Sequence, residues 1–111
     1  MQYPIYKPTI FPNTHKYVAD CLDSTWISSK GSYIKKFETS FTDYLKVNHA
    51  TSVSNGTTAL HMCLCALGVG KGDEVIVPSF TYIASVNAIK YVGAKPIFID
   101  SDKSTWNLNV A

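Results

Sequence analysis

The sequence predicts an α/β fold with a parallel sheet. From His49 onward the apolar segments become continuous rather than striped, and glycine or proline marks the joints between them. The expected order in this part is strand, helix, strand, helix, strand, with connections of a few residues. This alternation favours parallel strands joined by right-handed crossover helices.

Residues 1–48 are expected to form an extended arm and two helices. Prolines at positions 4, 8 and 12 interrupt backbone hydrogen bonding over residues 1–12, which indicates the arm. An N-cap at Asn13 should start a helix that runs to about Ser24. A second helix, over residues 33–45, should bury one apolar stripe made of Ile34, Phe37, Phe41, Tyr44 and Leu45.

Residues 49–111 are expected to be the first, incomplete part of an α/β domain. Strands are predicted at residues 49–53, 74–77 and 96–100. Between them, residues 54–58 are expected to form a turn into a helix that runs to Leu67, and a further helix is expected near residues 81–92. Residues 59–67 of the first of these helices leave almost no polar face, so we expect it to be buried against a sheet. Gly68 and Gly93 should end the two helices.

Composition restricts the class of protein. The 111 residues are 46% hydrophobic and 16% charged, which suits one globular domain or part of a larger one. All ten basic residues are lysine, so the chain offers neither a run of cations for nucleic acid nor an arginine fork for phosphate. Three cysteines make no closed disulfide set and residues 1–12 lack the apolar core of a signal peptide, so a reducing cytoplasm is expected. No stretch is apolar enough for a membrane span.

The segment Val53–Leu60 carries the strongest local signal. Small polar residues there join the carboxyl end of a predicted strand to an apolar helix. Free backbone N–H groups and the positive end of the helix dipole favour an anion, and Gly56 would let a phosphate approach the backbone. An ordinary N-cap at Ser54 or Asn55 is the alternative.

Other motifs are weaker. Residues 68–72 follow a helix and fit neither the dinucleotide-binding nor the P-loop pattern, so they are expected to be a turn. Only His61 and Cys65 could converge on one ion, and a packed apolar helix with no metal is preferred. An aromatic ring of Phe80 or Tyr82 could cover a planar cofactor or only the sheet edge. Trp26 is either a hydrophobic anchor or part of a sugar-binding surface.

Together these segments resemble the sugar-nucleotide aminotransferases of the DegT type, a branch of the PLP transferases of fold type I. The resemblance follows the family's order and spacing over nearly the whole chain. It is carried by residues 26–31, 37–38, 53–60, 72–78, 81–82 and 93–100.

The resemblance implies a partial three-layer αβα sheet and pyridoxal 5′-phosphate (PLP) as cofactor. Gly56, Thr57 and Thr58 match the positions that bind the cofactor phosphate, and Tyr82 matches the aromatic residue on its ring. Ser29 and Lys30 match a segment near the sugar nucleotide. The implied reaction transfers an amino group from glutamate to a nucleotide-linked 4-keto-6-deoxy sugar, in a homodimer.

The chain departs from the family in length. No lysine matches the residue that binds the cofactor covalently, and neither Asp100 nor Asp102 matches the acid that contacts the pyridine nitrogen. We therefore assign no catalytic residue, and expect an N-terminal portion that is inactive and poorly stable alone. The alternatives are a PLP-dependent sugar-nucleotide dehydratase, a truncated inactive gene product, or a small phosphate-binding module.

Overall fold

The protein is described by a computed structural model that covers residues 6–110. The chain divides into two compact units, Met1–Ser52 and Val53–Ala111, and each is described by itself. The first part of the predicted arm, residues 1–5, lies outside the described residues. No helix in the described part of the chain is both long and apolar enough to span a bilayer.

In the first unit, helix α1 covers Pro12–Asp23. The predicted cap at Asn13 is wrong, because Phe11 is the N-cap residue and Asn13 lies inside the helix. Proline suits the first helical position, since its φ is already helical and its missing N–H would have no partner there. The helix ends at Ser24, whose N–H donates to the carbonyl of Asp20 at 3.1 Å.

Helix α2 covers Ser32–Leu45, within one residue of its prediction. It ends at Lys46, which adopts a left-handed conformation with φ of 58°. Tyr33 connects the two helices, because its hydroxyl donates to Asp20 Oδ2 at 2.8 Å and its ring lies 5.3 Å from that of Tyr17. The hydrogen bond to Asp20, helped by partial desolvation, raises the pKa of Tyr33 to about 12.

The prediction that α2 buries one apolar face is wrong. No residue of α2 is buried, and the side chains of Phe37, Phe41 and Tyr44 are 56%, 44% and 82% exposed. The periodicity is that of a surface helix, but within this unit no described element forms a second layer over the stripe. An amphipathic pattern shows which face of a helix can pack against another element, but it does not show that such an element is present.

The strand predicted at residues 49–53 is also wrong, because this segment is irregular in the structure. A β-strand is defined by hydrogen bonds to a neighbouring strand. Among residues 6–110 no strand pairs with this segment. Segment 49–53 is therefore not part of a β ladder within the described residues.

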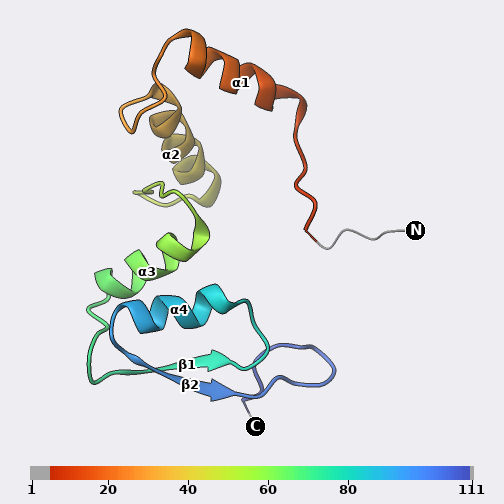
Figure 1. Cartoon of the computed structure of the whole chain (residues 1–111), viewed down its shortest axis with the longest axis vertical. Helices are drawn as coiled ribbons and strands as arrows, with labels where there is room; N and C mark the ends of the chain where they lie inside the picture. The colour runs from red at the N-terminus through yellow and green to blue at the C-terminus, as the bar shows by residue number, and fades with distance from the viewer. Residues whose placement is uncertain (1–5, 111) are drawn as a thin grey trace. The chain divides into compact units, whose positions relative to one another are not determined.

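The second unit contains α3, Gly56–Ala66; β1, Glu74–Pro78; α4, Ile83–Tyr91; and β2, Lys95–Ile99 (Figure 1). The strands pair in parallel, with Glu74 opposite Lys95 and Pro78 opposite Ile99. This pairing confirms the α/β class and the parallel sheet. Positive φ angles at Gly68 and Gly93 end the two helices as predicted.

A small core holds the second unit together. The buried residues are on β1, α4 and the turn before β2, namely Val77, Ala88, Ile89 and Ala94. Helix α4 packs on both strands, and α3 packs on α4. The prediction that α3 is buried against a sheet is therefore wrong: none of its residues is buried, and Leu60 and Met62 are 44% and 45% exposed. Instead of a strand, α3 contacts α4.

Candidate functional site

The bend before α3 is shaped by the side chain of Asn55. Asn55 is the N-cap residue, and its Oδ1 accepts hydrogen bonds from the backbone N–H of Thr58 at 2.9 Å and from the Thr58 hydroxyl at 3.1 Å. Such a cap satisfies one of the N–H groups that the first helical turn leaves without partners. Thr58 matches a phosphate-binding position of the family, and in the structure its N–H and its hydroxyl both donate to Asn55.

Two backbone donors at the same helix end remain available. The N–H groups of Gly56 and Thr57 have no partner within the described chain, nor does the Thr57 hydroxyl. They lie at the positive end of the α3 dipole, where an anion is stabilised. The geometry therefore offers two amides and one hydroxyl to a phosphate, with Thr58 held beside them.

Glycine at position 56 is not required by the protein's own packing. A Cβ built there would meet no atom within 4 Å, and the backbone does not adopt the left-handed conformation that favours glycine. The space next to the two available N–H groups is therefore open. That opening is what the close approach of a phosphate needs.

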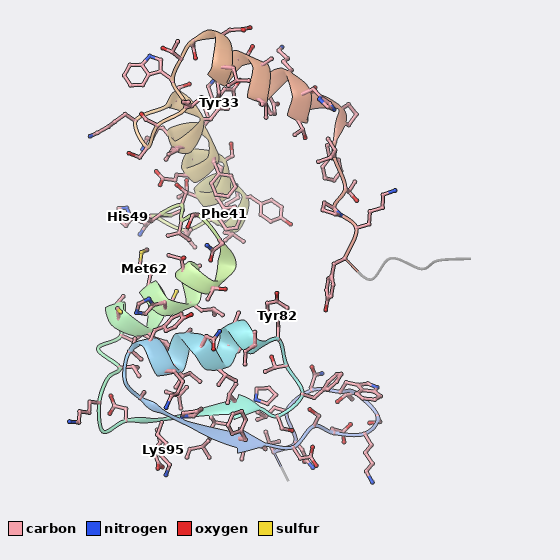
Figure 2. All side chains as sticks on the ribbon, viewed as in Figure 1. Tyr33, Phe41, His49, Met62, Tyr82 and Lys95 are labelled. Atoms are coloured by element: carbon pink, nitrogen blue, oxygen red, sulfur yellow. The ribbon has the colours of Figure 1, made fainter. Side chains whose placement is uncertain are left out.

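Tyr82 lies at the start of α4, where it is the N-cap residue. Its side chain is 69% exposed and projects away from the two strands (Figure 2). Helices α3 and α4 pack together and begin at the same end of the second unit (Figure 1), so the first turn of α3 and the N-cap of α4 lie at one edge of this unit. The carboxyl ends of both strands lie at this edge, where open α/β sheets bind ligands.

A cavity of about 430 Å³ at the carboxyl ends of the strands was not predicted from the sequence. Its lining comes from the ends of β1 and β2 and from the loop after β2, namely Ser79, Phe80, Asp100, Ser101, Asp102, Lys103 and Trp106. Trp106 adopts a φ of 61°, and its ring centroid lies 5.3 Å from that of Phe80. The sequence signal for this loop is the Asp-x-Ser-Thr pattern of an Asx-turn.

Asp102 organises that loop. Its Oδ1 accepts hydrogen bonds from the hydroxyl and N–H groups of Ser104 and Thr105. The hydroxyl of Ser104 contributes most, and together these donors lower the pKa of Asp102 to about 2. Through Oδ1, this carboxylate acts as the capping group of a turn.

The turn that precedes α2 presents Ser29 and Lys30. Their side chains are exposed and have no hydrogen-bond partner in the described part of the chain. The turn is tight, because a Cβ on Gly31 would lie 2.9 Å from the carbonyl oxygen of Trp26. Trp26 itself is 58% exposed, so it does not anchor the turn in a described core.

No metal centre is formed in the region that the structure describes, since nowhere in it do three histidine, cysteine, aspartate or glutamate side chains gather. The His61 ring instead packs edge-on against Tyr91, with 5.5 Å between the ring centroids. Cys63 and Cys65 are both exposed and free. The helix that carries these residues serves packing against α4.

Replacing Asn55 with alanine is expected to lower the free energy of unfolding by about 1 kcal/mol, because the α3 cap is lost. Asn55→Asp keeps the acceptor and should retain most of the stability. Urea unfolding followed by circular dichroism measures both. Ser54→Ala is the control, since the Ser54 hydroxyl contacts only the Asn55 amide. Equal losses in the alanine and aspartate variants would contradict a capping role.

The parallel strands, the helices that begin at their carboxyl edge and the similarity to the solved structures given below identify the fold class as that of the PLP transferases of fold type I. The chain belongs to the DegT/DnrJ/EryC1/StrS aminotransferase family, whose model matches residues 8–111.

Three similar proteins illustrate the match. GDP-perosamine synthase of Escherichia coli O157:H7 is 61% identical over 112 residues, which are 100% of this chain and 31% of that protein. A putative sugar aminotransferase of Streptococcus pneumoniae in its PMP form superposes with a TM-score of 0.86 at 34% identity, over 98% of this chain and 27% of that one. GDP-4-keto-6-deoxy-D-mannose-3-dehydratase of E. coli, with bound hydrated PLP, gives a TM-score of 0.83 at 30% identity, over 97% and 29%. The chain thus spans less than a third of each.

Proposed function

We propose that this chain forms the cofactor-phosphate portion of a PLP-dependent aminotransferase that makes GDP-perosamine. The reaction would move an amino group from glutamate to C4 of a GDP-linked 4-keto-6-deoxy sugar. The observation that carries the proposal is the 61% identity with a GDP-perosamine synthase across the whole chain. The two available N–H groups at the start of α3 support it, because they suit the phosphate of PLP.

Each proposed role rests on a described environment. The N–H groups of Gly56 and Thr57 would bind the phosphate, with Thr58 kept in place by Asn55. The exposed ring of Tyr82 would cover the pyridine ring. When bound, PLP supplies the electron-withdrawing ring that carries the amino group between donor and acceptor.

The sugar nucleotide would meet Ser29 and Lys30. Their exposure on a constrained turn supports this role, because a lysine ammonium and a hydroxyl can contact a diphosphate or a sugar without first breaking other bonds. The proposal places the lysine that binds PLP covalently outside residues 1–111. It also includes a homodimer in the cytoplasm, as the family resemblance implies.

The test uses the full-length gene product, PLP, ¹⁵N-glutamate and GDP-4-keto-6-deoxy-D-mannose. Mass spectrometry should detect a GDP-sugar in which the keto oxygen is replaced by a ¹⁵N amino group. Omitting PLP from the apoprotein is the control, and it should remove the product. A fully assembled, PLP-loaded protein that leaves the sugar unchanged would refute the proposal.

A second candidate is a PLP-dependent dehydratase of the same sugar nucleotide. The observation that favours it is the TM-score of 0.83 with the E. coli 3-dehydratase. The same assay separates the two, since a 3-dehydratase removes oxygen from C3 and incorporates no ¹⁵N into the sugar. The mass of the product therefore decides between the candidates.

A further inference from the structure

Glu38 makes two hydrogen bonds to one distant residue of the first unit. It lies on α2, and its Oε1 accepts hydrogen bonds from the backbone N–H of Ser52 at 2.9 Å and from the Ser52 hydroxyl at 3.1 Å. Both residues are half-buried. Hydrogen bonds to a charged acceptor are stronger than those between neutral groups. The contact joins residues that are 14 positions apart in the sequence.

The segment around Ser52 has little else to hold its backbone. Of the N–H groups of residues 49–53, only that of Ser52 donates a hydrogen bond within the described chain. The segment also has no strand partner there. Glu38 is thus the one acceptor that fixes this backbone on the way to the bend at residues 54–58. Only Val53 separates Ser52 from the bend.

We propose that Glu38 is a positioning residue for the cofactor phosphate: by holding Ser52, it restricts the chain that leads into the bend whose Gly56 and Thr57 N–H groups bind the anion. This inference rests on the proposed function. A segment that is ordered before its ligand arrives loses less conformational entropy on binding, so the ligand binds more tightly. Glu38 acts through the chain and touches no ligand itself.

The surroundings of Glu38 keep it charged. Donation from the Ser52 N–H, then from its hydroxyl, lowers the pKa of Glu38 below the ordinary value, and Lys35 adds to this effect. His49 and Lys35 line the same hollow of about 120 Å³ as Glu38. The carboxylate therefore accepts both bonds at neutral pH, and these bonds are lost only as the pH falls below the usual glutamate range.

The experiment measures two affinities on the full-length gene product without cofactor. Pyridoxine 5′-phosphate is the probe, because it lacks the aldehyde that would react with surface lysines, and pyridoxine is the same probe without the phosphate. Glu38→Ala should lower the affinity for pyridoxine 5′-phosphate roughly tenfold and leave the affinity for pyridoxine unchanged. Glu38→Gln should stay within about twofold of wild type, since its amide oxygen still accepts both bonds.

Asp43→Ala is the matched control, because Asp43 is an exposed carboxylate on the same helix and makes no hydrogen bond or ion pair in the described chain. It should change neither affinity. Amide hydrogen exchange at Ser52 should accelerate in Glu38→Ala but not in Glu38→Gln or Asp43→Ala. A merely structural role would lower both affinities together, and that result would overturn the inference.

The outcomes separate this inference from the proposed function. Wild type that binds pyridoxine 5′-phosphate no better than pyridoxine refutes the phosphate site itself. Wild type that prefers the phosphate, with Glu38→Ala retaining the preference, refutes only the role of Glu38. If Glu38→Ala does not fold, Ser52→Ala replaces it. This variant keeps the hydrogen bond from the N–H of residue 52, and its ratio of affinities for pyridoxine 5′-phosphate and pyridoxine should fall about threefold. An unchanged preference there also overturns the inference.

Discussion

Gly56→Asp is expected to weaken PLP binding by about 100-fold while leaving the protein at least as stable as wild type. The aspartate carboxylate would stand beside the N–H groups of Gly56 and Thr57 and repel the phosphate. The same charge is favourable for α3, because its first turn contains no acidic residue and an anion there stabilises the helix by about 0.3–1 kcal/mol. Binding and stability should therefore change in opposite directions.

Gly56→Asn is the control for size, because asparagine has the same shape as aspartate without the charge. It should weaken binding less than Gly56→Asp, and the difference should shrink as salt concentration rises. Isothermal titration with pyridoxine 5′-phosphate and urea unfolding give the two quantities. If Gly56→Asp binds the probe as well as wild type, the phosphate does not lie at the start of α3.

Ile89→Ala is expected to destabilise the second unit by about 3 kcal/mol. Ile89 is 3% exposed and lies in the small cluster that joins α4 to β1. Removing its side chain leaves a cavity in a core of very few buried residues, so few neighbouring side chains can replace the lost packing. Because Tyr82 is the N-cap residue of α4, loss of this packing should also make the position of Tyr82 less well defined.

Ile83→Ala is the matched control, since Ile83 is on the same helix and is 61% exposed. The same substitution there should change the free energy of unfolding by less than about 0.5 kcal/mol. Urea denaturation followed by tryptophan fluorescence and circular dichroism measures both variants. Equal effects at the two positions would show that the cluster around Ile89 is not the core of this unit.

The elements that the sequence predicts correctly are those set by local chemistry. Helix α2, the strands near residues 74 and 96, and the glycines that end α3 and α4 all follow from side-chain period and backbone preference. The Asn55 cap is of the same kind: it was one of two candidates for the bend, and the hydrogen bond to Thr58 selects it. Residue type and immediate neighbours are enough for such features.

The features that the sequence misses depend on distant partners. The segment 49–53 has the residues of a strand but no neighbour to pair with, and α3 has the apolar surface of a buried helix but only α4 against it. Glu38 and Ser52 form a contact that no local sequence pattern predicts, because they are 14 positions apart. The cavity beside Trp106 likewise forms because a loop folds back to the strand ends.

In the turn before α2, the crowded backbone at Gly31 restricts which positions can be substituted without disturbing the loop. The 2.9 Å approach between a Cβ at this position and the Trp26 carbonyl means that any side chain there forces the loop to rearrange. Ser29 and Lys30 carry no such constraint. A library that randomises those two positions and keeps glycine at 31 could therefore be screened for altered sugar-nucleotide preference on an intact scaffold.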